Sequence, residues 1–124
     1  MPKRGGNIAV YEEEIRDDDE HYFPDIDDEE AIRADGDRFL LVKLVSTLDA
    51  DVDVNLCGTT FDDPDFDEEA VDAVTDLDDV TGVTGDKDVT FVQSHRIWKY
   101  FRIKVKANST PTEGKLKVVF AVGL

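Results

Sequence analysis

Carboxylates are the commonest side chains in this sequence that can hold a ligand, and their spacing limits what they can bind. An EF-hand calcium loop that began at Asp49 would have Asp49, Asp51 and Asp53 at its first, third and fifth positions. Such a loop needs glycine at its sixth position and a bidentate glutamate at its twelfth. The sequence has Val54 and Thr60 at those positions, so the calcium motif fails.

A second group of carboxylates follows closely and comprises Asp62, Asp63, Asp65 and Asp67. Oxygen ligands of this kind can hold a structural cation on a loop, and the spacing leaves that alternative open. An acidic surface in contact with solvent is the simpler interpretation. We therefore expect no metal and no cofactor.

The nucleophiles and bases of the sequence are too scattered to predict catalysis. His21 and His95 are far apart, and with Cys57 as the one cysteine they complete no zinc-binding spacing. Ser94 lies beside His95 but lacks the surrounding Gly-x-Ser-x-Gly of a nucleophile elbow. No glycine-rich phosphate loop is present. The sequence predicts a protein that is not an enzyme.

Negative charge dominates the composition. Thirty Asp and Glu residues against 14 Lys and Arg give a net charge of -16, and the sequence pI is near 4.2. Such a chain repels itself at low salt, whereas at about 1 M salt the Debye length falls to about 3 Å. The excess of Asp is typical of proteins from extreme halophiles; an acidic mesophilic protein or a calcium binder is the alternative.

The same composition argues against two classes of partner. A strongly negative chain is disfavoured as a nonspecific ligand of nucleic acid. No stretch approaches the roughly 18 apolar residues of a membrane span. We expect neither nucleic acid nor a membrane as a partner.

The basic residues are concentrated near the C-terminus. Residues 96–124 hold seven bases and one acid, a net of +6, so residues 1–95 carry -22. A basic surface on an acidic chain favours an acidic neighbour. That neighbour is the chain's own N-terminal segment, a sister subunit or a different protein; lysines that protect an edge strand from pairing are the alternative.

Two segments in this basic region alternate between apolar and polar residues. Residues 98–106 have Phe101, Ile103 and Val105 on one face and Tyr100, Arg102, Lys104 and Lys106 on the other. Residues 115–124 have an apolar face of Leu116, Val118, Phe120, Val122 and Leu124. A period of two predicts half-buried strands. We expect a hairpin whose apolar face forms the core, while Tyr100, Arg102 and Lys104 contact a partner.

Other segments complete a predicted all-β fold. Residues 38–48 are apolar on both faces, which predicts a central strand covered on both sides, and residues 52–57 predict its hairpin partner with one wet face. Residues 88–93 predict a further strand, and residues 68–75 fit a short helix or a strand equally well. The pattern favours an antiparallel β-sandwich of jelly-roll or Ig-like type; a small open β-barrel is the alternative.

The N-terminal residues predict an acidic arm outside the domain. From Glu12 to Glu30 there are 12 acids and one base, a charge density typical of a solvated segment. The arm nevertheless holds apolar residues for which we expect contact with a partner: Ile8, Val10, Tyr11, Ile15, Tyr22 and Phe23. We therefore divide the chain into an arm at 1–30, which can also be disordered, and a sandwich at 31–124 that folds without it.

Three short motifs carry a resemblance over roughly residues 38–124. They are Gly58-Thr-Thr-Phe-Asp-Asp63, Trp98-x-Tyr-Phe-Arg-Ile103 and Thr110-Pro-Thr-x-Gly114. The chain resembles the small β-sandwich virion proteins of haloarchaeal tailed viruses, such as capsid decoration or turret proteins and small head-tail or tail components. These motifs are strand and turn signatures, so the resemblance assigns no catalytic or ligand-binding residue.

The resemblance implies a structural protein of a virus particle that assembles as a homo-oligomer. Its implied partners are other virion proteins such as the major capsid protein, and its implied location is the virion, assembled in the host cytoplasm. Two alternatives from other classes stay open: a soluble haloarchaeal ligand-binding or adhesion domain, and a host-directed accessory protein.

Overall fold

The structure is a computed structural model, and it describes residues 6–33, 39–59, 61–67, 79–83, 85–92 and 99–123. Every regular element in these ranges is a strand. The undecided segment at 68–75 lies outside the described residues. The strands are β1 (Gly6–Glu13), β2 (Glu20–Phe23), β3 (Ile32–Arg33), β4 (Phe39–Ser46), β5 (Val52–Thr59), β6 (Asp79–Val83), β7 (Gly85–Val92), β8 (Tyr100–Ala107) and β9 (Leu116–Gly123).

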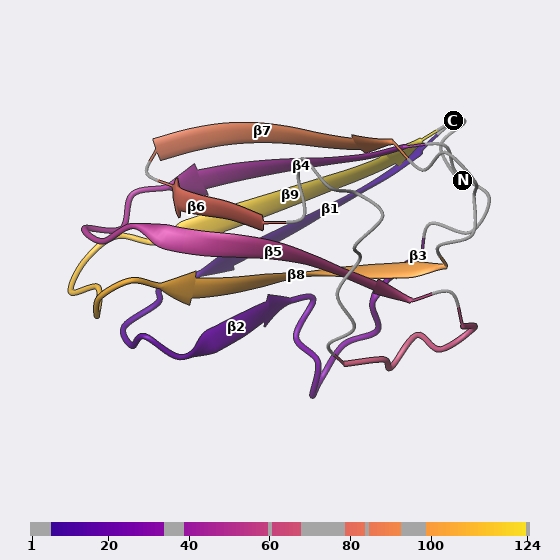
Figure 1. The fold of residues 1–124 in the computed structure, drawn as a ribbon, viewed down its shortest axis with the longest axis horizontal. Helices are drawn as coiled ribbons and strands as arrows, with labels where there is room; N and C mark the ends of the chain where they lie inside the picture. The colour runs from indigo at the N-terminus through magenta and orange to yellow at the C-terminus, as the bar shows by residue number, and fades with distance from the viewer. Residues whose placement is uncertain are drawn as a thin grey trace.

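The strands form two antiparallel sheets that face each other (Figure 1). One sheet has the order β1-β9-β4-β7 and is called the β1 sheet below. The other has the order β2-β8-β5-β6, with β3 following β2 along the same edge of β8, and is called the β8 sheet. This architecture confirms the predicted antiparallel β-sandwich.

The pairing of the strands is nested along the chain. The first strand pairs with the last, β2 and β3 pair with β8, β4 pairs with β7, and β5 pairs with β6. A long antiparallel ribbon that folds over on itself produces this order, which is that of a jelly roll. Because β2 and β3 share one position beside β8, they act as a single interrupted strand.

Both predicted hairpins are wrong, although the strands in them are right. β8 and β9 follow each other in sequence but lie in different sheets, and so do β4 and β5. Each connection therefore crosses from one layer to the other, a distance of about 10 Å in a sandwich. Turn-forming residues between two alternating strands predict a reversal of the chain, but they do not say in which sheet the returning strand pairs.

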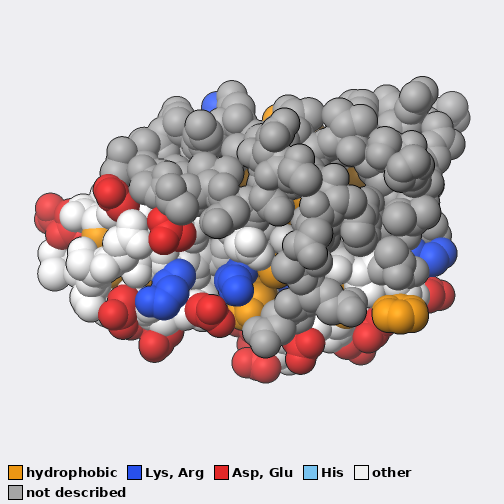
Figure 2. Space-filling view, viewed as in Figure 1, with side chains coloured by type: hydrophobic (Ala, Val, Ile, Leu, Met, Phe, Trp, Pro, Cys, Tyr) orange, Lys and Arg blue, Asp and Glu red, His pale blue; other side chains and the backbone are white. Residues whose placement is uncertain are grey.

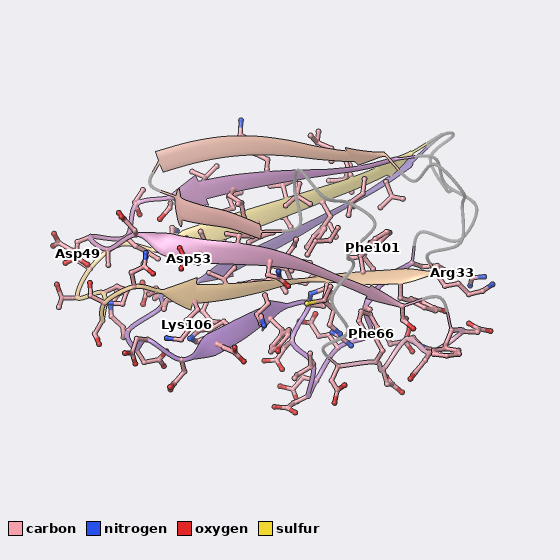
Figure 3. The ribbon with its side chains drawn as sticks, viewed as in Figure 1. Arg33, Asp49, Asp53, Phe66, Phe101 and Lys106 are labelled. Carbon is pink, nitrogen blue, oxygen red and sulfur yellow. The ribbon has the colours of Figure 1, made fainter. Side chains whose placement is uncertain are left out.

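The core lies between the sheets and uses the predicted faces of β8 and β9. Phe101, Ile103 and Val105 are buried on β8, and Leu116, Val118, Phe120 and Val122 are buried on β9. Leu124 lies outside the described residues. Figure 3 shows Phe101 on the side of β8 that faces the other sheet. The alternation of the sequence therefore predicted the inward faces correctly.

The prediction for residues 38–48 is right about position and wrong about cover. β4 is a central strand, with β9 on one side and β7 on the other. Leu40, Val42 and Leu44 are buried in the core, but Leu41 and Val45 on the opposite face are only half-buried. An apolar residue on the outer face of a sandwich looks the same in the sequence as one covered by a second layer.

The predicted boundary at residue 30 is wrong, because the acidic segment is part of the sandwich. β1 pairs with β9 over its whole length, from Gly6 opposite Gly123 to Glu13 opposite Leu116. Ile15 and Phe23 belong to the core, with 1% and 3% of their surfaces exposed. A few well-placed apolar side chains therefore dock a segment whose acids stay in solvent.

Two loops that join the sheets meet at one end of the sandwich. The Thr47 N–H donates to the Lys115 carbonyl, and the Lys115 N–H donates to Thr47 Oγ1, both at 2.9 Å. The Asp49 carboxylate accepts a hydrogen bond from the Thr112 N–H, also at 2.9 Å. These bonds hold the loop after β4 against the loop after β8.

Gly114 allows this close approach. Its φ is +87°, and a Cβ at this position would lie 2.0 Å from the Thr47 carbonyl oxygen. Its own carbonyl accepts a hydrogen bond of 2.8 Å from Arg16 Nη1, which ties the segment after β1 to the same end. Only glycine fits here, because any side chain would push the two loops apart.

Candidate assembly surface

Among the described residues, which leave out Ser94 and His95, those that the sequence offers for chemistry do not converge. Within the described ranges, no three His, Cys, Asp or Glu side chains are placed to hold a metal ion. The acidic loop uses its groups locally: the Asp65 N–H donates to Asp63 Oδ1 (3.1 Å), and Tyr100 donates its hydroxyl hydrogen to Asp62 Oδ1 (3.3 Å). These carboxylates shape the loop.

No helix in the described part of the chain is long and apolar enough to cross a membrane.

His21 is held between two carboxylates. Its Nδ1 lies 2.6 Å from Glu13 Oε2, and its Nε2 lies 2.8 Å from Asp17 Oδ1. The hydrogen bond from His21 lowers the pKa of the Asp17 carboxyl below its ordinary value. Both ring nitrogens thus contact carboxylates, one at the end of β1 and one in the loop between β1 and β2.

The most unusual surface is the outer face of the β1 sheet, which is the face turned away from the core. β1 is an edge strand of this sheet and pairs only with β9 among the described residues. On its outer face Ile8 is 69% exposed and Val10 is 53% exposed. Large apolar side chains this exposed on a sheet edge indicate a contact that one chain alone does not complete.

The register shows how far this apolar surface continues. Ile8 pairs with Ala121, which in turn pairs with Leu41 on β4. In the next row Val10 pairs with Val119. Together with Val45, these six residues form what we call the apolar face: Ile8, Val10, Leu41, Val45, Val119 and Ala121.

Few charges interrupt the apolar face. Three cross-strand rows of outward residues on β1, β9 and β4 contain the apolar face. The other outward residues in these rows are Glu12, Lys43 and Lys117. One acid and two bases leave this part of the surface slightly positive on a chain with a net charge of -16. The sequence prediction included Ile8 and Val10 but missed Leu41, Val45, Val119 and Ala121. The signal available in the sequence was that β4 and β9 have apolar residues at some of their outward positions as well as at their inward ones.

A cleft of about 320 Å³ opens beside β1, where the edges of the two sheets approach each other. Its walls come from β1, β9 and the segment that includes β3: Ile8, Ala9, Tyr11, Glu30, Ala31, Ile32, Arg33, Phe120 and Val122. Tyr11 packs edge-on against Phe120, with ring centroids 5.8 Å apart. Burial and the nearby Glu29 carboxylate raise the pKa of Tyr11. The cleft is mainly apolar and continuous with the exposed edge.

Arg102 is not on the surface, contrary to the prediction that it contacts a partner. It faces outward from β8 as expected, but it is 0% exposed because two loops cover it. Its five N–H groups donate to five backbone carbonyls: those of Phe66 (2.8 Å), Pro24 (2.8 Å), Asp25 (3.2 Å), Glu29 (2.9 Å) and Pro64 (3.1 Å). Every donor of the guanidinium is used.

This arginine binds the loop 24–31 and the loop 61–67 to the outer face of the β8 sheet. The Phe66 ring stacks on the guanidinium, with its centroid 5.5 Å from Arg102 Cζ. Burial lowers the pKa of Arg102, while the carboxylates of Asp65 and Asp25 act in the opposite direction. A guanidinium is not deprotonated in proteins, so the group stays charged. Its charge strengthens each hydrogen bond to a carbonyl.

A second, smaller core forms under the two loops. It comprises Ala31, Cys57, Phe66 and Tyr100, with Tyr22 packed against it. Tyr100 is therefore buried, contrary to the prediction that it contacts a partner. Cys57 is 1% exposed. In Figure 3, Phe66 lies on the side of β8 opposite Phe101, so β8 has packed side chains on both of its faces at this end.

The other end of the β8 sheet's outer face is open and charged. Lys104 lies 3.6 Å from the Glu20 carboxylate, and Lys106 is exposed beside Asp53. Figure 2 shows this side of the molecule with acidic groups in red around a few basic ones. Part of the acidic neighbour expected for the basic region is therefore the chain itself: Glu20 reaches Lys104, and Glu12 reaches Lys115 at 3.4 Å.

The nine residues predicted to contact a partner thus have different environments. Ile8 and Val10 are exposed, whereas Tyr11, Tyr22 and Lys104 are half-buried in contacts within the chain. The remaining four, which are Ile15, Phe23, Tyr100 and Arg102, are buried. Ile8 and Val10 are the two of this set whose side chains are open enough to form the centre of a contact.

No protein-family model matches the sequence, and no curated protein is similar to it. Solved structures share the fold, among them three with TM-scores of 0.50 to 0.52. The chain is similar to a subunit of the Bacillus endospore appendages, a family of disulfide-linked pili (11% identity, 96% of this chain and 87% of that one, TM-score 0.52). It is also similar to the Yersinia pseudotuberculosis-derived mitogen (17%, 95% and 86%, 0.50) and to the SPBc2 prophage-derived protein YomS (12%, 98% and 97%, 0.50).

Viral coat proteins are also among the similar structures, for example that of Tobacco streak virus, with 8% identity and a TM-score of 0.47. Similarity at this level carries no functional argument. The three structures above show the β-sandwich architecture alone, because their identities to this chain are also very low.

Proposed function

We propose that this chain is a non-enzymatic structural subunit of a virus particle that assembles as a homo-oligomer. In the finer form of this proposal the particle is that of a haloarchaeal tailed virus. The subunit is then a capsid decoration or turret protein, or another head or tail component, bound to a partner such as the major capsid protein. Its location is the virion, assembled in the host cytoplasm.

One observation carries the proposal: an exposed edge strand continues into an apolar outer face on a strongly acidic molecule. Ile8 and Val10 lie in this edge, and the apolar face extends from them across β9 to β4. Two exposed large apolar side chains beside a half-buried apolar surface favour a contact with another subunit, and repeated contacts of this kind produce closed symmetric assemblies. Because Cys57 is buried, we expect these contacts to be non-covalent.

The acidity supports the halophilic part of the proposal. Twenty-one Asp residues and a net charge of -16 favour association only where salt screens the charges. A particle that exists in brine satisfies this condition both inside and outside its host.

A mass-spectrometric inventory of purified particles tests the function. We expect the chain in stoichiometric ratio to the major capsid protein, retained through a density gradient in high salt. If the chain is found only in the soluble fraction of infected cells, the structural role is wrong. Presence in fewer than one copy per capsomer, with enrichment in tail fractions, would assign it to the tail.

The cleft beside β1 favours a second candidate, a ligand-binding or adhesion domain. Its volume of about 320 Å³ is within the range of small-molecule sites, and Glu30 and Arg33 add charge to an otherwise mainly apolar wall. Such a domain would be monomeric and soluble. If the chain is such a domain, added ligand should protect the cleft residues from hydrogen exchange. If it is a structural subunit, assembly should protect β1 instead.

A further inference from the structure

We propose that β1 pairs antiparallel with β1 of a second copy, about a two-fold axis next to Ala9. The pairing joins two four-stranded β1 sheets into one continuous sheet. This inference rests on the proposed homo-oligomer and names the surface and the register through which it forms. The contact is isologous, so one edge supplies both sides of the interface.

The free edge of β1 has the properties of a strand that pairs. Over its eight residues it has hydrogen-bonding partners in β9 on one side, and its other side is a sheet edge in the described structure. Edges that must stay unpaired are usually blunted by lysine, proline or a bulge. Residues 8–11 are Ile-Ala-Val-Tyr, with no such residue, and their register with β9 has no irregularity.

The side chains of β1 are self-complementary in one register. When Ala9 faces Ala9 of the partner, Ile8 faces Val10 of the partner, and Val10 faces Ile8 of the partner. Glu12 then lies opposite Gly6 of the partner, so the carboxylates are at opposite ends of the ladder. A register centred on Val10 would instead place Ile8 opposite Glu12, which pairs an apolar side chain with a charge.

This register also makes the apolar face continuous. Leu41, Ala121 and Ile8 lie in one row of the sheet, and the row continues into Val10 and Val119 of the partner. Cross-strand apolar pairs of this kind stabilise a sheet. The interface therefore extends over side chains of three strands from each copy in addition to the backbone hydrogen bonds.

Charge explains why a second copy of the chain meets it through this surface. Two chains of net charge -16 repel each other wherever their acidic surfaces meet. The outward positions of β1, β9 and β4 hold one acid, Glu12, and two bases, Lys43 and Lys117. In contrast, the loops over the β8 sheet hold nine acids at 24–31 and 61–67. Like chains can approach closely through the apolar face and not through the covered one.

A charge exchange across the two-fold axis tests the pairing and its register. Analytical ultracentrifugation of the full chain in about 1 M potassium chloride should give twice the 13.9 kDa mass of one chain. Ile8→Lys alone places lysine opposite Val10, and Val10→Glu alone places glutamate opposite Ile8. Each should raise the dimer dissociation constant at least about tenfold. The double variant Ile8→Lys/Val10→Glu pairs lysine with glutamate twice and should restore most of the affinity.

Cysteine crosslinking provides a second measurement of the register. Ala9→Cys places two thiols directly opposite each other, where Cα atoms of an antiparallel pair are about 4.5 to 5.5 Å apart, within the range of a disulfide. We expect a covalent dimer on a non-reducing gel after mild oxidation. Ile8→Cys places its thiols diagonally, at about 7 to 8 Å, and should crosslink far less. The parent chain, with buried Cys57 alone, is the control.

The outcomes separate this inference from the proposed function. A monomeric parent, single variants that stay dimeric, or a double variant no tighter than the singles would overturn the β1 pairing. A monomer that is nevertheless stoichiometric in particles would leave the structural role intact. A β1-paired dimer that is absent from particles would overturn the structural role and leave the pairing in place.

Discussion

The two sheets of this sandwich share one core but have opposite outer faces. Around Arg102, the outer face of the β8 sheet is covered by the chain's own acidic loops, which Arg102 holds through five backbone carbonyls. The outer face of the β1 sheet holds the apolar face and has no such cover within the described residues. The covered part of the β8 sheet is therefore completed within the chain, and the apolar face of the β1 sheet is available to a partner.

The difference teaches that hydrophobicity alone does not decide what covers a sheet. A buried guanidinium and two tyrosine-containing strands recruit loops that are rich in aspartate, because the loops offer backbone carbonyls inward and carboxylates outward. The more apolar face has no such cover among the described residues. Changes to the covered face and to the open face should therefore have effects of very different size.

Deletion of residues 1–30 should abolish folding. It removes β1 from one sheet and β2 from the other, together with the core residues Ile15 and Phe23 and three of the carbonyls that bind Arg102. Circular dichroism in high salt should show no cooperative β-sheet transition. A truncated chain that melts like the parent would mean that the segment is an arm after all. Deletion of residues 1–5 is the matched control.

Lowering the salt should uncover the β8 sheet before it unfolds the sandwich. The two covering loops hold nine acids, so their mutual repulsion grows fastest as screening falls. Cys57, which is buried beneath them, should then react with a thiol reagent at a salt concentration at which circular dichroism still shows β structure. Below a few tenths molar, by the scale of the Debye length, the β signal itself should be lost.

Simultaneous loss of both signals would show that cover and core form one cooperative unit. Full stability in dilute buffer would contradict the halophilic interpretation of the charge. A variant with Asp27→Asn and Asp28→Asn, two exposed acids of the first loop, should shift the release of Cys57 to lower salt.

Replacement of Arg102 by alanine should cost about 3 to 5 kcal/mol of stability, since it leaves five buried or part-buried carbonyls without their donor. Urea unfolding in high salt measures this loss. Lys106→Ala, an exposed position on the same face of the same strand, should change stability by less than about 0.5 kcal/mol. Arg102→Lys should be intermediate, because one ammonium has three donors in place of five. Equal effects at positions 102 and 106 would contradict the anchoring role.

Polar substitution on the apolar face should barely affect the stability of the monomer. Val119→Thr keeps the β-branched shape and changes a half-buried outward side chain, so we expect a change below about 1 kcal/mol in urea unfolding at low protein concentration. Val118→Thr, the neighbouring inward position with 0% exposure, should cost more, because it buries a hydroxyl in the core. A larger effect at 119 than at 118 would reverse the inward and outward faces of β9.

The smallest expected effect is the pH dependence of stability that comes from Asp49, at the end of the sandwich where the loop after β4 meets the loop after β8. Hydrogen bonds from Thr112 lower the pKa of the Asp49 carboxyl from its ordinary 3.8. A lowered folded-state pKa contributes stability that is present above pH 3.8 and is lost as the pH falls through the folded value. Asp49→Asn should therefore be less stable than the parent at neutral pH, and the difference should shrink below pH 3.8. Asp18→Asn, at an exposed position, controls for the change in net charge. A difference that widened in acid would contradict the sign of the shift.

Sequence alone determined the all-β fold class of this protein and which sides of β8 and β9 face the core. Alternation of period two identified the faces of β8 and β9 that form the core. Successive side chains of a strand point to opposite faces, so the apolar set must lie on the buried face. Composition determined that the surface is strongly acidic. These are local properties, since each depends on neighbouring residues along the chain and not on which strand pairs with which.

Tertiary structure decided the strand pairing, the place of the N-terminal segment and the fate of each outer face. Whether the strand after a turn stays in its sheet or crosses to the other depends on contacts between residues about a hundred positions apart, such as β1 with β9. Arg102 and Val119 both lie at outward positions of alternating strands, yet one is fully buried and the other is only half-buried. Two distant loops present their carbonyls to the first, and the position of those loops follows from the nested pairing of the whole chain.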